Sequence, residues 1–212
     1  MPNSLGPGEL LARYGTPEQQ EYFLPRLANG TLIPCFGLTG PHSGSDATSL
    51  INSDAVVEER DGVLGLRASF DKRYITLAPV AGVVGIGLNL SDPNNLLQGK
   101  GTEGFSVALL ERDHPGLQMG PRHYPLNAAF MNGTVQGQDV WIPMESVLGG
   151  QERCGYGWHM FVECLAEGRG VSLPAGSAGA GRGVVSAVGA YPRVRKQYRV
   201  PIAEFGGIQE GK

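Results

Sequence analysis

The sequence predicts an α+β fold, with a central antiparallel β-barrel or sandwich flanked by a short N-terminal helical segment and the first helices of a C-terminal helical bundle. Three observations predict this class. Helix-capping residues and helical periodicity open the chain, short apolar runs separated by turns fill residues 32–148, and helical periodicity returns after Gly149 and Gly150. We therefore expect domains at residues 1–31, 32–149 and 150–212.

Residues 16–30 predict the opening helix. Thr16 has the right chemistry for an N-cap, Pro17 suits the first helical position, and Gln19 is the matching capping-box residue. The apolar stripe and the stop signal are Tyr22, Phe23, Leu27 and Asn29-Gly30. Pro25 lies inside this run, and we expect it to kink the helix or end it early.

The middle of the chain alternates apolar runs with turns. Asp61-Gly62, between residues 55–59 and 63–70, is a strong hairpin signal. Pro93-Asn94-Asn95 and Pro115-Gly116 mark further turns. Glycine makes up 33 of 212 residues, about twice the usual share, which indicates many tight turns and places where backbone approaches a ligand.

After Gly150 the period becomes helical again. Trp158, Phe161 and Leu165 recur at helical spacing and predict a helix from near Tyr156 to near Ser172. A second helix is expected from Gly176 to about Tyr198. Its basic residues lie near the end, where cations suit the helix dipole, and are Arg193, Arg195 and Lys196.

Composition excludes several classes of protein. Apolar residues make up 41% and charged residues 17%, with a net charge of -3, so disorder, a coiled coil and nucleic-acid binding are disfavoured. No signal peptide is visible, and residues 75–90 are interrupted by Pro79, so no transmembrane segment is expected. Cys35, Cys154 and Cys164 form no CxxC pair, and the four histidines have no metal-like spacing. These features predict no metal site and a cytoplasmic location.

The densest candidate site is residues 35–47. An apolar run leads into a loop of small residues, whose accessible backbone N–H groups and Thr39, Ser43 and Ser45 hydroxyls suit a polar planar ring or a phosphate. From the chemistry alone, an ordinary Gly/Ser turn is the favoured interpretation.

Longer motifs in this segment resemble the acyl-CoA dehydrogenase family. The first signature of its middle β-domain is matched by Phe36-Gly37-Leu38-Thr39-x-Pro41-x-x-Gly44-Ser45-Asp46-Ala47, and a following strand motif by Asp71-Lys72-Arg73-Tyr74-Ile75-Thr76-Leu77-Ala78. Likeness to the long-chain bacterial branch rests on Phe130-Met131-Asn132-Gly133, on residues 162–174 and on Gly189-Ala190-Tyr191. The motifs follow the family's order.

The resemblance implies FAD as cofactor. Backbone groups of Phe36 and Leu38 and the Thr39 hydroxyl would meet the pyrimidine edge of the flavin. Ser45 would lie near the FAD pyrophosphate or near the pantetheine arm of the substrate.

Two further residues follow from the second motif. Tyr74 would lie beside the flavin face, where much of the family has Trp, and the Thr76 hydroxyl would approach the flavin N5. An aromatic face and a hydrogen bond both tune a flavin. Without the neighbouring motif, plain cross-strand packing is the favoured explanation of Tyr74 and Thr76.

Residues of the C-terminal part can also be matched. Arg169 matches an arginine near the thioester end of the substrate site, although a solvated helix cation is the simpler alternative. Arg195, with Gln197 and Tyr198, resembles an Arg-x-x-aromatic segment that in the family reaches the FAD of the neighbouring subunit in a homodimer or higher homo-oligomer. Arg199 replaces the glycine that usually follows, and Pro192 falls inside the expected helix, so this part of the match is incomplete.

The implied reaction is α,β-dehydrogenation of a fatty acyl-CoA, as in fatty-acid β-oxidation, with electrons passed to an electron-transfer flavoprotein. In most relatives the catalytic glutamate would lie beyond Lys212, so we expect an incomplete chain that is inactive alone. In some branches the base precedes the arginine, a position that is Gly168 here. Glu167 is one residue away and a weak candidate; Glu163 is a further turn away.

Two other functions remain open. A non-catalytic flavin-binding or interaction β-domain would explain the missing base together with Pro192 and Arg199. A related flavoenzyme, such as an acyl-CoA oxidase, would share the same motifs.

Overall fold

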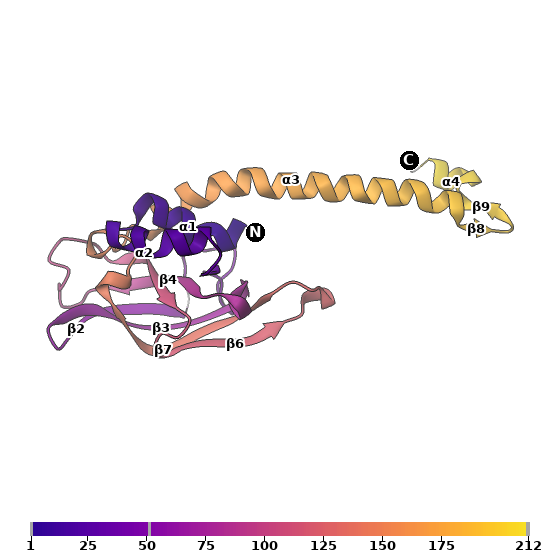
Figure 1. Cartoon of the computed structure of the whole chain (residues 1–212). Helices are drawn as coiled ribbons and strands as arrows, with labels where there is room; N and C mark the ends of the chain where they lie inside the picture. Colours follow the sequence, from indigo (N-terminus) through magenta and orange to yellow (C-terminus); the bar gives the residue numbers. More distant parts are fainter. Residues whose placement is uncertain (1, 51, 211–212) are drawn as a thin grey trace. The chain divides into compact units, whose positions relative to one another are not determined.

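The computed structural model describes residues 2–50 and 52–210, apart from the side chains of residues 2–5, 167 and 168. The chain divides into two compact units, Met1–Ala166 and Glu167–Lys212. The first unit contains a curled β-sheet with helices, so the α+β class is confirmed (Figure 1). The predicted boundaries after residues 31 and 149 remain predictions.

Two helices open the first unit: α1, Pro2–Tyr14, and α2, Pro17–Ala28. The predicted capping box is confirmed, because the Thr16 hydroxyl accepts from the Gln19 N–H and the Gln19 side chain accepts from the Thr16 N–H. Pro25 lies within α2, yet the helix continues to Ala28. The proline therefore does not end the helix early.

Seven strands form one sheet in the first unit, in the order β1-β4-β2-β3-β7-β6, with β5 paired to β4. The strands are β1, Pro34–Gly37; β2, Ser53–Arg60; β3, Val63–Thr76; β4, Val83–Ser91; β5, Gly104–Glu111; β6, Leu117–His123; and β7, Asn132–Pro143. The predicted hairpin is confirmed. Asp61 and Gly62 join β2 to β3 with φ values of 52° and 81°, the left-handed pair typical of a two-residue turn.

The sheet is mixed rather than wholly antiparallel. β1 and β2 both pair in parallel with β4, on consecutive stretches of it: Pro34 faces Val83, and Asp54 faces Asn89. The other pairs are antiparallel. The expectation of an antiparallel sheet is therefore corrected for these two pairs, since they join segments that are far apart in sequence.

Two hydrophobic clusters cover the two faces of the sheet. One is formed mainly by β2, β3, β4 and β7, and the other lies between the helices and strands β1 and β5. β5 contributes to both, because Val107 and Leu109 face the helices while Ala108 and Leu110 face the other cluster. The side chains that α1 and the start of α3 contribute are Leu10, Leu11, Met160, Phe161, Cys164 and Leu165.

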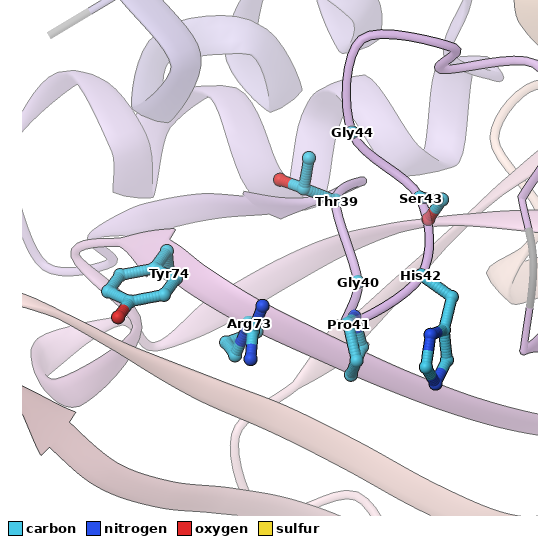
Figure 2. Close-up of a pocket in the computed structure, with 8 residues that line it drawn as sticks. All are labelled: Thr39, Gly40, Pro41, His42, Ser43, Gly44, Arg73 and Tyr74. Carbon is cyan, nitrogen blue, oxygen red and sulfur yellow. The ribbon is translucent and has the colours of Figure 1, made fainter.

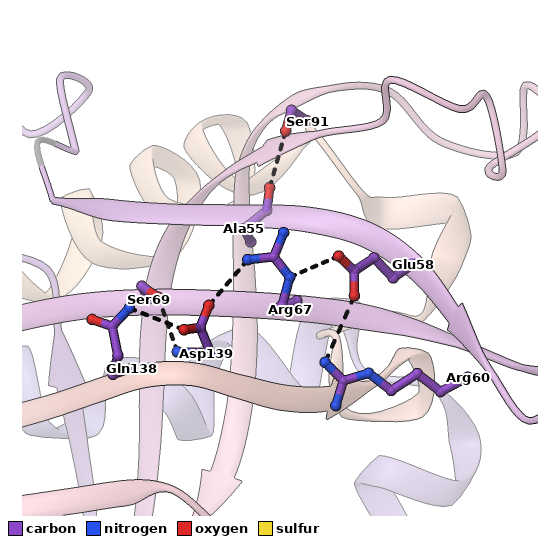
Figure 3. A network of polar contacts seen from close by, with 8 residues as sticks. All are labelled: Ala55, Glu58, Arg60, Arg67, Ser69, Ser91, Gln138 and Asp139. Atoms are coloured by element: carbon purple, nitrogen blue, oxygen red, sulfur yellow. Dashed lines mark hydrogen bonds and ion pairs between the residues drawn. The ribbon is translucent and has the colours of Figure 1, made fainter.

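Polar side chains cross β2, β3 and β7 on an exposed part of the sheet (Figure 3). The Arg67 guanidinium donates to Glu58 at 2.7 Å and to Asp139 at 3.0 Å, and Arg60 lies 3.7 Å from the second Glu58 oxygen. These hydrogen bonds raise the pKa of Arg67. The network fixes neighbouring strands on a face that borders solvent.

A single helix, α3, runs from Gly157 to Val194 and includes Pro174 and Pro192. The prediction of two helices, near 156–172 and 176–198, is therefore wrong about the break. Each proline removes only one backbone donor, and the bonds on either side continue the helix.

The rest of the second unit is a short hairpin of β8, Lys196–Gln197, and β9, Val200–Pro201, followed by η5, Ile202–Glu204, and α4, Gly206–Gln209.

Among the described residues, no helix has the length and apolar character needed to cross a bilayer, and no group of His, Cys, Asp and Glu is placed to hold a metal ion. Cys35, Cys154 and Cys164 are free and buried. Burial raises the pKa of the Cys35 thiol to about 12 and that of Cys154 to about 11, so both stay protonated near neutral pH.

Candidate functional site

The candidate site is a pocket of about 420 Å³ between the loop after β1 and the end of β3 (Figure 2). This volume is within the usual range of small-molecule sites. Its lining residues are Thr39, Gly40, Pro41, His42, Ser43, Gly44, Arg73 and Tyr74. Thr39 and Tyr74 belong to two separate motifs of the sequence, and the fold brings them to one cavity.

A β-bulge turns Tyr74 toward the pocket. Lys72 pairs with Val135 and Ile75 pairs with Gly133, so β3 holds one residue more than β7 over this stretch. Tyr74 has a φ of 58°, a left-handed conformation that is uncommon for an aromatic residue. Its side chain is 53% exposed, and its ring contacts His123 with centroids 4.3 Å apart. An exposed aromatic face therefore borders the pocket.

Backbone bonds fix the loop that forms the other wall. The Gly40 N–H donates to the Ser43 carbonyl at 3.0 Å and bridges the two ends of the bend at Pro41 and His42. The Arg73 N–H donates to the Thr39 carbonyl at 3.1 Å and joins the loop to β3. The two walls of the pocket are thus bonded to each other at one end.

A buried hydroxyl in the wall lacks a partner. Ser43 is 8% exposed, and its Oγ makes no hydrogen bond within the described part of the chain. A buried polar atom left unpaired costs about 1–3 kcal/mol. Ser43 therefore offers the pocket a hydrogen-bonding group that a ligand can satisfy.

The pocket lining carries one guanidinium. Arg73 lies 5.5 Å from the centre of the Tyr74 ring, in a cation–π contact. None of the lining residues named above is a carboxylate. The site can therefore receive an electron-rich or anionic planar group, and its own walls provide no acidic group that could act as a base.

Four other predicted residues of the loop and strand lie outside this lining. The Phe36 side chain is buried and stacks on Phe161 at 5.6 Å, and Leu38 packs against the same cluster. Ser45 is exposed, one residue beyond the pocket wall. Thr76 is half-buried and faces Asn132 on β7. The roles assigned to these four residues stay predictions. For Phe36 and Leu38 the predicted contacts are made by backbone groups, so the position of their side chains does not test them.

Arg169, Arg195 and Gln197 lie in the second unit. Arg169 is half-buried on α3. Arg195 is exposed, and its Nη2 donates to the Gln197 amide oxygen at 2.7 Å when that amide is turned to face it. Tyr198 and Arg199 form the turn between β8 and β9, both with positive φ.

Glu163 and Glu167 are the two glutamates considered as the catalytic base. Glu163 accepts a hydrogen bond from the Tyr14 hydroxyl and pairs with Arg13 at 3.4 Å and His159 at 3.2 Å. This cluster ties α1 to the start of α3 and engages both carboxylate oxygens. The Glu167 side chain lies outside the described residues.

The Ser43 hydroxyl, which the sequence predicts as a lining group, does line the pocket. His42 and Arg73 have no predicted role, yet they stand inside the quoted motifs and line the pocket, so adjacency to Thr39 and Tyr74 was a usable signal. His123 has no such signal, because only the pairing of β6 with β7 brings it to Tyr74.

Comparison with known proteins finds two similar relatives. No model of a known protein family matches the chain. Protein HemX of Proteus mirabilis is 44% identical over 101 residues, 48% of this chain and 59% of its own length. A probable short/branched chain specific acyl-CoA dehydrogenase of Dictyostelium discoideum is 32% identical over 198 residues, 93% of this chain and 44% of its own.

The solved structures point the same way. Acyl-CoA dehydrogenase of Bacillus anthracis, complexed with FAD, superposes with a TM-score of 0.76 at 27% identity, over 95% of this chain and 32% of its own. The α+β fold of this chain is thus the fold of an acyl-CoA dehydrogenase structure. Over nearly its whole length the chain is similar to members of the acyl-CoA dehydrogenase family, and it spans less than two thirds of the length of each of these three proteins.

Proposed function

We propose that this chain provides the FAD-binding face of an acyl-CoA dehydrogenase that acts on fatty acyl-CoA in β-oxidation. The observation that carries the proposal is the cavity lined by both Thr39 and Tyr74, one from each motif. When bound, FAD supplies the two-electron acceptor for dehydrogenation next to the thioester.

The residues of the pocket fit a flavin. The exposed Tyr74 ring offers a stacking face, Thr39 offers a hydroxyl at the opposite wall, and the unpaired Ser43 Oγ offers a buried polar contact. Phe36, Leu38, Ser45 and Thr76 remain proposed contacts to the same cofactor or to the substrate arm. Arg169 remains a proposed substrate contact.

Assembly and electron transfer belong to the same proposal. Arg195 and Gln197 would reach the FAD of a neighbouring subunit in a homodimer or larger homo-oligomer, since a guanidinium suits a pyrophosphate. An electron-transfer flavoprotein would accept the electrons. Three free thiols agree with the proposed cytoplasmic location.

A titration of the purified chain with FAD, followed by the visible spectrum and by quenching of flavin fluorescence, tests cofactor binding. Tyr74→Ala should weaken FAD binding by about tenfold, because one aromatic contact is worth about 1–1.5 kcal/mol. Tyr74→Phe should keep the affinity, and so should Tyr156→Ala, which removes another exposed tyrosine. Failure of the parent chain to bind FAD would contradict the proposal.

The catalytic base is proposed to come from outside the pocket lining, with Glu167 as a weak candidate. The flavin-loaded chain should then give no turnover with a long-chain acyl-CoA and an artificial electron acceptor. Turnover that is lost in Glu167→Gln would instead identify this glutamate as the base.

A further inference from the structure

Lys72 is a buried lysine that the flavin proposal does not use. It lies on β3 and is 0% exposed, which is rare for a lysine. Its Nζ donates to the Leu38 carbonyl at 3.0 Å and to the Ser53 Oγ at 2.5 Å. Both acceptors are neutral oxygens, so Lys72 makes a link between segments and not a buried ion pair.

The link joins the two walls of the pocket where they begin. Leu38 immediately precedes Thr39, and Lys72 immediately precedes Arg73 and Tyr74. The neighbouring bond from the Arg73 N–H to the Thr39 carbonyl runs between the same two segments. The side-chain bond adds a third segment, because Ser53 starts β2.

The local sequence leaves room for this side chain. A Cβ added to Gly37 would lie 3.3 Å from Lys72 Cγ, closer than most such contacts. The glycine at the end of β1 therefore lets the aliphatic part of Lys72 pass beneath the loop and reach Leu38.

We propose that Lys72 is a positioning residue that holds the start of the Thr39–Gly44 loop in place, by bonding the Leu38 carbonyl to Ser53, and thereby preserves the pocket for the flavin. The effect on the loop is independent of any ligand. The effect on flavin affinity rests on the function proposed above.

The strength of this link should depend on pH. Burial lowers the pKa of Lys72 to about 7, and the charged groups that face it, Asp71 on β3 and Asp54 on β2, oppose this only in part. Gly37, Leu38 and Ser53 add no charge. Opening of the loop returns the Lys72 Nζ to water, where the amine binds a proton more tightly than in the closed fold. Opening is therefore coupled to proton uptake, and the loop should open less often as pH rises through about 7.

Hydrogen exchange of the ligand-free chain tests the link. Lys72→Met keeps the length and removes the donor, Lys72→Gln keeps a neutral donor, and Lys100→Met is a control at an exposed lysine. Near pH 6, Lys72→Met should speed exchange of residues 38–44 at least tenfold while β4 and β5 stay protected. Exchange of residues 38–44 in Lys72→Gln should be faster than in the parent and slower than in Lys72→Met. Exchange in the Lys100→Met control should match that of the parent.

Two results would overturn the link: unchanged loop exchange in Lys72→Met, or an equal rise throughout residues 2–166, which would mean simple destabilisation. In the parent, exchange of residues 38–44 corrected for its intrinsic pH dependence should fall from about pH 6 to about pH 8, and in Lys72→Met it should not. If Lys72→Met does not fold, Ser53→Ala serves as the second variant and should loosen the same loop several-fold.

Flavin titration separates this inference from the proposed function. If the parent binds FAD, Lys72→Met should bind it at least tenfold more weakly near pH 6, and equal affinity would overturn the effect on the pocket. If the parent binds no FAD, the proposed function fails, while the exchange data still decide whether Lys72 holds the loop.

Discussion

Lys72 is the residue whose titration should be visible in the stability of the whole first unit. Its pKa is about 7 when folded, against 10.5 for an unperturbed lysine. Between these values the unfolded chain holds a proton that the folded chain does not, so the free energy of unfolding should rise with pH. For this one group the rise from about pH 6 to about pH 9 should be on the order of 2 kcal/mol.

Denaturant unfolding of the parent and of Lys72→Met at several pH values checks this prediction. The difference in the free energy of unfolding between the two proteins should change with pH in the stated direction, because titration of the other groups cancels in the comparison. A constant difference from pH 6 to pH 9 would mean that Lys72 keeps an ordinary pKa in the fold.

Arg199 has a left-handed backbone conformation that is strained for a residue with a side chain. It is the second residue of the β8–β9 turn and has a φ of 69°, where glycine is favoured and other residues cost about 1–2 kcal/mol. Arg199→Gly should stabilise the hairpin by about 0.5–1 kcal/mol after the greater unfolded-state freedom of glycine is included. Amide exchange in residues 196–201 should slow about two- to fivefold, whereas Arg199→Ala should give no gain.

At the scale of elements, one buried amide connects α2 to the end of the sheet. The Gln19 Nε2 donates to the carbonyls of Glu145 and Val147, both at 2.8 Å, and its Oε1 accepts from the N–H groups of Thr16 and Gly149. The capping residue predicted from the sequence is therefore also a contact between two elements.

Removal of this amide should be costly. Gln19→Ala leaves buried backbone groups unpaired, and each costs about 1–3 kcal/mol, so we expect a loss of about 2–4 kcal/mol in the free energy of unfolding. Gln138→Ala, at an exposed residue of β7, should stay within about 0.5 kcal/mol. A small effect of Gln19→Ala in chemical denaturation would show that water replaces these bonds.

The elements that local signals encode are those the sequence predicts well. The capping box at Thr16 and the turn at Asp61-Gly62 depend on neighbours in sequence, and both form. The parallel pairing of β1 and β2 with β4 depends on distant segments, so no local pattern reveals it. The predicted gap between the two C-terminal helices does not form, because α3 continues through Pro174 and Pro192.

At the scale of the whole molecule, the candidate site also combines features that the local sequence predicts with features that depend on distant segments. Thr39 and Tyr74 were predictable because each lies in a recognisable motif. The bulge that turns Tyr74 outward and the bonds of Lys72 were not, since they arise from strand register and from burial in the folded chain. Motifs thus indicate which residues meet, while the tertiary structure determines what each residue does there.

The central claim is that the loop after β1 and the end of β3 form one flavin site. Hydrogen exchange of the chain with and without saturating FAD tests it most directly. The account predicts slower exchange in residues 38–45 and 73–76, and no change in the β2–β3 turn around Asp61. Protection confined to other segments, or no protection at FAD concentrations that saturate a full-length relative, would contradict it.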